Sequence, residues 1–537
     1  MSTKFVHLKI KAFFTDCFTT TIKIMIALKK IKAVLLLLLI NVWANSQSKL
    51  PRSNPEAEGV SSAGIIKFLD AIANSKHEMH SLMILRHGKV IAEGWWNPYR
   101  PDLKHTMYSV SKTFTATAIG FAVSESRITV NDKVTSFFPA QLPDTVTTNL
   151  ADLTIKDVLS MTVGQAPDPT GLAITGNRPW STTFLSLPIK DEPGTKFLYN
   201  SLGSYMLSAI IQKVTGQKVI DYLRPRLFTP LGIQGMDWEV DPEGINSGGW
   251  GLRVKTEDMA KFGQLYLNKG KWNGEQLLPA AWIEEATKMK IDQAPDQPQS
   301  KKDSSDWMQG YCYQIWRCRY NGYRADGAFG QYIIVMPELD AVIAITSETP
   351  NMQGEINLVW EYLLPAFQKK KLPASKSLAV LNQKLAALKL PPPAKTTSPV
   401  EKSISGKTFT IESNQSNVES VSFQFKNNTC YVGLKTDTAL HKFEFGAGSW
   451  KEGTTTKKGP SLVGRAKAHF AGLPAPKIDC SYSWKDDVTL ELLIRYIESP
   501  HTEKISCRFE DNKVSIDISN SFDTNPADKK QELKGSY

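Results

Sequence analysis

A serine and a lysine three residues apart stand at the start of a segment with helical periodicity. Ser109 and Lys112 open the run 109–120, in which Phe114 and Ala118 recur at helical spacing. Side chains three apart lie on one face of a helix, so the lysine amine is expected beside the serine hydroxyl. An amine in that place can activate a serine without a histidine, and the helix dipole favours the oxyanion that forms. The spacing therefore indicates a candidate nucleophilic serine at Ser109.

The Ser-x-x-Lys pattern is short, and the chain carries a second copy at 46–49 with no helical pattern behind it. Alone, the pattern also fits an exposed serine and lysine on an ordinary helix. Two absences narrow the class of serine hydrolase that the chain could be. None of the eight histidines lies between residues 106 and 440, and no Gly-x-Ser-x-Gly motif occurs. A Ser-His-Asp hydrolase is therefore disfavoured. His105, four residues before Ser109, is interpreted as a hydrogen-bonded structural residue rather than as a base. The base, if there is one, is then a lysine or a tyrosine.

The elements that must position these residues come in the order strands, helices, strands: a helix-rich middle lies between two groups of strands. This order predicts an α+β domain built on one antiparallel sheet. Periodicity and turn residues predict helices over 61–74, 155–161, 203–214, 256–267, 279–289 and 355–368, and strands over 81–86, 89–94, 311–317, 331–336 and 341–346.

The composition of the chain changes after residue 370. A Lys-rich stretch, a short Ala/Leu/Lys helix and three consecutive prolines predict a linker over 371–403. Short runs of alternating apolar and polar residues then predict a smaller all-β C-terminal domain over 404–530, a sandwich or a small barrel. The predicted order is a leader over 1–46, a catalytic domain over 47–370, the linker and the accessory domain.

The N-terminal segment has the pattern of an export signal. Lysines precede an apolar run over 33–40, and small residues at 44–46 provide a cleavage site. The protein is therefore expected to be exported to the bacterial periplasm, with Met1 or Met25 as its start, and an uncleaved anchor is the alternative. No later stretch is long enough to span a membrane. Seven Lys against one Asp in 1–46 supply more than half of the net charge of +11, so nucleic acid is not an expected partner.

Cysteine usage argues against a disulfide framework and against metal. Five cysteines follow the leader, and Cys312 and Cys318 are too far apart on one extended strand to bridge. No Cys-x-x-Cys pair or metalloprotease His spacing occurs. No metal and no cofactor are expected.

Four stretches resemble the serine hydrolases related to class C β-lactamases and DD-peptidases. They are the segments 109–112, 153–162, 192–201 and 251–263. The resemblance covers residues 52–368 and implies an α+β fold whose antiparallel sheet is flanked by helices and an all-helical subdomain. It also implies an acyl-enzyme on Ser109, with Lys112 and Tyr199 sharing the proton. A lysine desolvated beside this phenol loses part of its preference for the charged form, and its charge favours the phenolate.

The second motif departs from the family pattern. The family usually has Tyr-x-Asn, whereas this chain has Tyr199, Asn200 and Ser201. Ser201 is expected to replace the third-position asparagine toward substrate, and Asn200 is retained as a second substrate-binding candidate.

The third motif departs further. The family's third motif is Lys-Thr-Gly or His-x-Gly, and its best match here is Ala328–Gln331. In this match an alanine, Ala328, stands where the family has its lysine or histidine. In this register Phe329 and Gly330 face substrate, and the backbone N–H of Gln331 pairs with that of Ser109 as the oxyanion hole.

This register lacks a group that would bind a substrate carboxylate. Arg253 and Arg324 are possible replacements, although each is expected to be a solvated arginine. Efficient β-lactam hydrolysis is therefore disfavoured, and an ester, a small amide or a peptide fragment is the expected substrate. The alternative is a non-hydrolysing, acyl-accepting sensor or a binding protein. The role of the all-β domain and the oligomeric state stay open.

Overall fold

The computed structural model describes residues 49–523 and 531–537. The predicted leader over 1–46 lies outside them. Within the described residues, no helix combines the length and the apolar character needed to cross a membrane.

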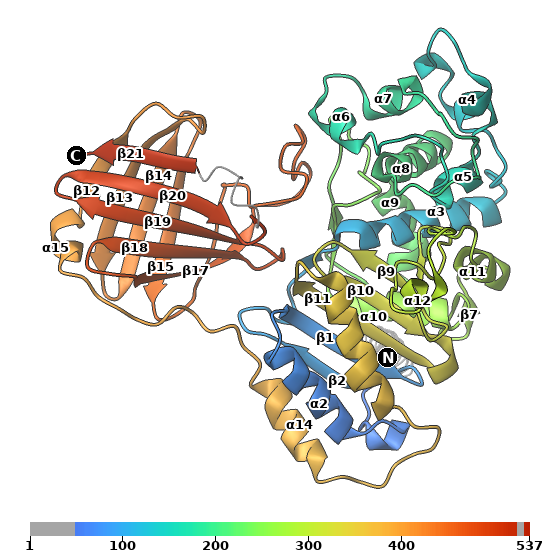
Figure 1. Ribbon diagram of the computed structural model, residues 1–537, viewed down its shortest axis with the longest axis horizontal. Helices are drawn as coiled ribbons and strands as arrows, with labels where there is room; N and C mark the ends of the chain where they lie inside the picture. The colour runs from blue at the N-terminus through green and yellow to red at the C-terminus, as the bar shows by residue number, and fades with distance from the viewer. Residues whose placement is uncertain (1–48, 524–530) are drawn as a thin grey trace, which may run out of the picture. The chain divides into compact units, whose positions relative to one another are not determined.

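A six-stranded antiparallel sheet forms the centre of the first domain (Figure 1). Its spatial order is β2-β1-β11-β10-β9-β8. The strands are β1 (Glu78–Arg86), β2 (Lys89–Trp95), β8 (Trp316–Arg317), β9 (Tyr323–Gly327), β10 (Gln331–Met336) and β11 (Ala341–Glu348). His87 and Gly88 both have positive φ, as the two-residue turn of the β1–β2 hairpin requires.

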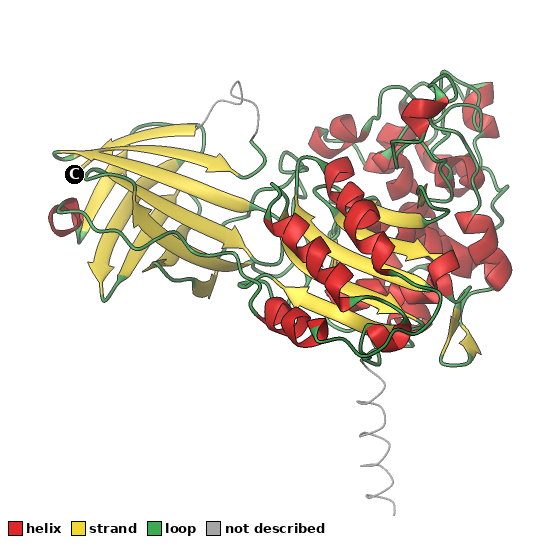
Figure 2. Ribbon diagram, turned by 60° about the horizontal axis from the view of Figure 1, so that its bottom comes forward, coloured by secondary structure: helices red, strands yellow, loops and turns green. Residues whose placement is uncertain are grey.

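Helices cover both faces of this sheet (Figure 2). Every residue of β10 is buried, as expected for a strand covered on two sides. One face packs on α10 (Thr256–Leu267), where a Cβ at Gly263 would lie only 2.6 Å from Val342. The other face packs on helices that include α2 (Ser62–Ala73), α13 (Met352–Leu358) and the π-turn η7 (Val359–Leu363).

A helical subdomain lies between β3 and β4 in the chain. It contains α3 (Ser111–Ser124), η3 (Val134–Phe137), η4 (Pro139–Gln141), α4 (Thr148–Asp152), α5 (Ile155–Leu159), α6 (Thr170–Thr175), α7 (Trp180–Ser186), α8 (Ser201–Thr215), α9 (Val219–Leu223) and η5 (Arg224–Phe228). The small sheet β3-β5-β4 joins β3 (His105–Thr106), β5 (Leu252–Val254) and β4 (Asp237–Trp238).

The remaining short elements of the first domain connect these layers. They are η1 (Glu56–Glu58), η2 (Tyr108–Val110), β6 (Lys271–Trp272), β7 (Glu275–Gln276), α11 (Ala280–Thr287), α12 (Gln299–Lys302), η6 (Pro337–Leu339) and η8 (Leu364–Ala366).

The C-terminal strands form a closed barrel. Their order is β15-β14-β13-β12-β21-β20-β19-β18-β17-β16, and a parallel β15–β17 pairing closes the ring. The strands are β12 (Lys407–Ile411), β13 (Val418–Lys426), β14 (Thr429–Thr436), β15 (Leu440–Ala447), β16 (Lys451–Thr454), β17 (Lys477–Trp484), β18 (Thr489–Tyr496), β19 (Thr502–Glu510), β20 (Lys513–Asn520) and β21 (Gln531–Ser536). The α+β class and the all-β C-terminal domain are thus confirmed.

Several sequence expectations differ from the structure in detail. The expected strand over 311–317 is reduced to β8, because the chain turns at Gln314 with a φ of 56°. Strand β9 was not expected, and β21 lies wholly beyond residue 530, where the expected all-β domain ended. The short helix expected in the linker is present as α14 (Ser377–Ala386), but its Leu381 is fully buried in the core of the first domain. The second linker helix, α15 (Val400–Ile404), was not expected.

Candidate active site

Ser109 lies in the single 3-10 turn η2, directly before α3. Every residue of α3 from Ser111 to Ala122 is buried, so this helix is enclosed on all sides rather than amphipathic. Ser109 itself is half-buried. The turn therefore exposes one hydroxyl at the end of a helix that the core holds rigidly.

Lys112 is buried with a relative exposure of 1%. Its Nζ donates to the Oγ of Ser109 at 3.1 Å, to the Oγ of Ser201 at 3.1 Å and to the carbonyl oxygen of Gly249 at 2.8 Å. Burial disfavours the ammonium and lowers the pKa of Lys112 to about 7. The amine next to Ser109 is therefore available in its neutral form near neutral pH.

Tyr199 reaches Ser109 from the segment before α8. Its ring stacks on Trp316 at 5.6 Å between centroids, and Lys112 Nζ lies 4.8 Å from the centre of the same ring. Burial raises the pKa of the Tyr199 phenol far above its usual value, and the nearby Ser109 hydroxyl only partly opposes this. The phenol is therefore protonated at neutral pH, which differs from the expectation that the lysine charge favours the phenolate.

The two residues after Tyr199 have different surroundings. Ser201 contacts Lys112, whereas Asn200 is buried and caps α8, with its Oδ1 accepting from the N–H of Gly203 at 2.8 Å. The Asn200 Nδ2 donates to Gln165 at 3.0 Å. Both amide groups of Asn200 are engaged inside the protein, so the geometry does not support its expected substrate contact.

Two carboxylates that sequence reasoning missed act on this site. The charges of Asp168 and Asp326 both raise the pKa of Lys112, opposing its burial. Asp168 Oδ2 also accepts from the N–H of Ser201 at 3.5 Å. Asp326 lies near the end of β9, the strand absent from the sequence prediction, and its partner is Arg324 at 2.9 Å.

The segment expected to form the third motif turns sharply between β9 and β10. Phe329 and Gly330 have φ values of 66° and 93°. The Phe329 ring packs on Tyr108 and His501, with centroids 5.7 and 4.7 Å away. Gly330 is pressed against Glu355 and Ser347, because an added Cβ would lie 2.0 and 2.1 Å from their side-chain oxygens.

Gly327, the last residue of β9, approaches the serine segment closely. A Cβ on Gly327 would lie 2.2 Å from the carbonyl oxygen of Met107, two residues before Ser109. The Gln331 side chain donates to the carbonyl oxygens of Ala328 and Ser347. The role of the Gln331 backbone N–H in the oxyanion hole stays a prediction.

Both arginines expected to be solvated are buried in ion pairs. Arg324 is fully buried, pairs with Asp326 and lies over the ring of Trp307 at 4.3 Å. Arg253 makes two bonds of 2.7 Å to Asp237. The low dielectric of the interior explains why each keeps a carboxylate partner.

The other chemical candidates have structural surroundings. His105 is buried, with 3.0 Å between its Nε2 and His80, which agrees with its interpretation as a structural histidine. Cys312, Cys318, Cys430, Cys480 and Cys507 are free thiols. Among residues 49–523 and 531–537, no group of three or more His, Cys, Asp or Glu side chains could hold a metal ion.

An antiparallel sheet, a helical subdomain and a serine-lysine pair at the start of a buried helix define a serine hydrolase of the β-lactamase/transpeptidase fold. The family model described as Beta-lactamase matches residues 73–363, more than half of the chain. The chain belongs to this family.

The relatives are distant. The 6-aminohexanoate-dimer hydrolase of Paenarthrobacter ureafaciens is 25% identical over 292 residues, which cover 50% of this chain and 73% of that protein. An uncharacterized protein of Alkalihalophilus pseudofirmus is 22% identical over 228 residues, covering 37% of this chain and 62% of that protein, less than two thirds of its length.

A solved structure, the octameric penicillin-binding protein homologue from Pyrococcus abyssi, is 16% identical, covers 88% of this chain and 99% of its own, and has a TM-score of 0.45.

Proposed function

We propose that this protein hydrolyses an ester or an amide through an acyl-enzyme on Ser109. The observation that carries this proposal is the buried amine of Lys112, 3.1 Å from the Ser109 hydroxyl and with a pKa of about 7. A base whose pKa is near the working pH is partly unprotonated, so it can accept a proton, and it is still basic enough to take the proton of a serine. A surface lysine would be almost wholly charged and would not serve.

The proposed reaction assigns different roles to the lysine and the tyrosine. Neutral Lys112 accepts the proton of Ser109 as the hydroxyl oxygen attacks the substrate carbonyl. The Tyr199 phenol, protonated and close to Ser109, is the proton donor to the leaving group and recovers its proton from Lys112. The backbone N–H groups of Ser109 and Gln331 stabilise the oxyanion. Water then hydrolyses the acyl-enzyme, with the same groups acting in reverse.

The charges around the amine support a substrate without a carboxylate beside the scissile bond. Asp168 places negative charge near Lys112, and the positive charge of Arg324 is already neutralised by Asp326. A substrate carboxylate held there would be repelled, so we propose small neutral or amine-bearing esters and amides, including peptide fragments, rather than β-lactams. The name of the relative, a 6-aminohexanoate-dimer hydrolase, makes that dimer a reasonable test compound.

Covalent labelling tests the nucleophile. Wild type is expected to react with a fluorophosphonate probe, and Ser109→Ala is expected to lose all label. Lys112→Ala and Tyr199→Phe should fold but label about 100-fold more slowly or worse, as usual for loss of general base or acid. Tyr266→Phe is the matched control, because that hydroxyl bonds to Thr117 farther along α3.

The same experiment separates hydrolase from sensor. Turnover of any ester, amide or peptide in a panel, lost in Ser109→Ala, supports hydrolysis. Stable label with no turnover on the panel would favour an acyl-accepting sensor, and an unlabelled wild type would contradict both.

We also propose export to the periplasm, based on the sequence pattern of residues 29–46. N-terminal sequencing of the protein recovered from a periplasmic fraction should begin near residue 47. Recovery of the full-length chain only from the cytoplasm would contradict export.

A further inference from the structure

The residue before Ser109 has an unusual backbone conformation. Tyr108 has a φ of 43°, in the left-handed region that aromatic residues rarely adopt. Such conformations are unfavourable and persist only where the surroundings hold them. Because Tyr108 is joined directly to Ser109, whatever holds it also sets the direction of the Ser109 backbone.

A histidine of the barrel domain binds the Tyr108 side chain. His501 is fully buried, and its Nε2 lies 2.5 Å from the Tyr108 hydroxyl. Its Nδ1 lies 2.6 Å from Glu348, which also accepts from the hydroxyl of Ser521 at 2.6 Å. Burial lowers the pKa of His501, which favours a neutral ring. A neutral ring that donates from Nδ1 to Glu348 must accept the Tyr108 proton at Nε2.

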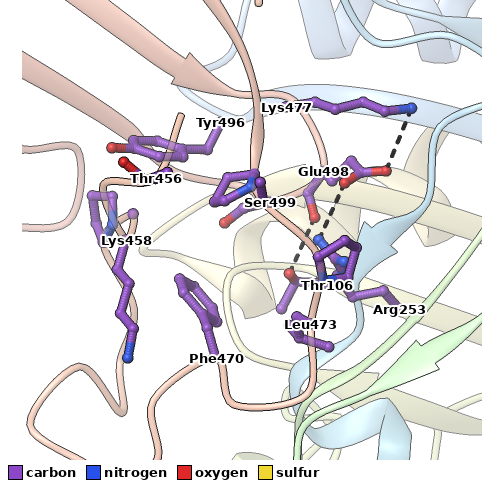
Figure 3. Close-up of a pocket in the computed structure, with 15 residues that line it drawn as sticks. Thr106, Arg253, Thr456, Lys458, Phe470, Leu473, Lys477, Tyr496, Glu498 and Ser499 are labelled. Carbon is purple, nitrogen blue, oxygen red and sulfur yellow. Dashed lines mark hydrogen bonds and ion pairs between the residues drawn. The ribbon is translucent and has the colours of Figure 1, made fainter. Parts of the chain in front are cut away.

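The same barrel turn binds the backbone two residues earlier. This turn, residues 497–501 between β18 and β19, presents the carbonyl oxygen of Glu498 to the N–H and Oγ1 of Thr106 at 3.0 and 3.1 Å. Figure 3 shows Glu498 between Thr106, Arg253 and Lys477. The Glu498 carboxylate also pairs with Arg253 at 3.2 Å. The turn therefore holds the serine segment at both Thr106 and Tyr108.

The surroundings of Tyr108 add further support from the barrel domain. Burial raises the pKa of its phenol, and the nearby residues Ser461 and Leu462, in the connection between β16 and β17, partly oppose this. Its ring faces Phe329, which in turn packs on Phe522 after β20. The barrel domain thus surrounds the residue next to Ser109 with several independent contacts.

We propose that the β18–β19 turn is part of the active-site scaffold and that His501 is a positioning residue for the acylation of Ser109. The Glu348–His501–Tyr108 chain holds Tyr108 in its left-handed conformation and so fixes the Ser109 N–H and hydroxyl for attack. This inference rests on the proposed role of Ser109 as nucleophile. It gives the barrel domain a part in the reaction, although none of its residues needs to touch the substrate.

Two amide substitutions at His501 test the proposal because each reproduces one ring nitrogen. In His501→Gln the amide lies near the place of Nε2 and can still bind Tyr108. In His501→Asn the amide lies near Nδ1 and can bind only Glu348. We expect His501→Asn to slow fluorophosphonate labelling about tenfold or more, which corresponds to one lost hydrogen bond, and His501→Gln to stay within about threefold of wild type.

Two further variants make the test specific. Tyr108→Phe keeps the ring and removes the hydroxyl, so it should slow labelling at least as much as His501→Asn. His441→Ala is the control, since His441 lies in the same barrel and bonds to Thr456. It should label like wild type. The melting temperature of every variant is measured as a control for stability. Labelling at several probe concentrations separates the maximal rate at saturating probe from probe affinity. We expect the maximal rate to fall.

The outcomes distinguish this inference from the function on which it rests. Equal labelling rates for His501→Asn and His501→Gln, or slowing that follows only the melting temperature, would overturn the positioning role. If neither variant nor Tyr108→Phe slows a wild type that labels well, the inference fails and the proposed function stands. An unlabelled wild type would overturn the proposed function and this inference with it.

Discussion

The Nζ of Lys112 lies 3.1 Å from the Oγ of Ser109, in a part of the protein from which almost all solvent is excluded. An amine in water holds its proton up to a pH near 10.5, but burial brings the pKa of Lys112 to about 7. The short distance and the lowered pKa together make this pair suitable for nucleophilic chemistry.

The pKa of Lys112 predicts how acylation depends on pH. Only the neutral amine accepts the serine proton, so the labelling rate should rise between pH 5.5 and 8.5 with a midpoint near 7, roughly tenfold per pH unit below it. The measurement is the second-order rate constant of fluorophosphonate labelling against pH. A midpoint above pH 9 would show that Lys112 stays charged at neutral pH.

Asp168→Asn should shift this midpoint to lower pH. The Asp168 carboxylate favours the ammonium of Lys112, so its removal leaves burial less opposed. The bonds that its Oδ1 accepts from Thr170 can be kept by asparagine, which limits the structural cost. The control is Asp152→Asn, which removes an equal charge from an exposed pair with Lys133. An unchanged midpoint in Asp168→Asn would contradict the assignment.

Gly327→Ala should damage activity through the backbone of the serine segment. The new Cβ would meet the carbonyl oxygen of Met107 at 2.2 Å, and this backbone leads directly to Ser109. We expect a loss of about 1–3 kcal/mol in unfolding free energy, as for other overpacked sites, with a labelling rate at least about tenfold lower. Gly171→Ala is the matched control, because a Cβ there has open space. Normal labelling in Gly327→Ala would refute this close approach.

Glu355→Gln should change how stability depends on pH. Burial raises the pKa of Glu355 from 4.5 to about 8, so the folded protein keeps a proton that the unfolded chain releases. The stability from this group is complete below pH 4.5 and is lost as the pH rises through 8. Urea midpoints of wild type should therefore decline between pH 5 and 8 relative to those of Glu355→Gln. Parallel curves for the two proteins would exclude a buried, protonated Glu355.

Local sequence was sufficient for the elements with regular periodicity. Helix α10 and strand β10 have the predicted bounds. The apolar residues of each keep a regular pattern along the whole element, and they are buried in the structure. Strand β9 was missed since its sequence, Tyr-Arg-Ala-Asp-Gly, contains two charged residues and ends in Asp-Gly, a pair that is typical of a turn. In the structure Arg324 and Asp326 neutralise each other inside the protein, a pairing that no local pattern indicates.

The sequence by itself determined that Ser109 and Lys112 lie together, because their distance is set by the repeat of a single turn of chain. The resemblance added Tyr199 as a site prediction, and it added the family; the family model confirms the family. Only the tertiary structure decided the pKa of Lys112, the burial of Asn200, Arg253 and Arg324, and the contact of His501 with Tyr108. The physical reason is that the residues that desolvate the Lys112 amine, place charge beside it and support the backbone at Ser109 are far apart in the chain. Folding alone brings them together.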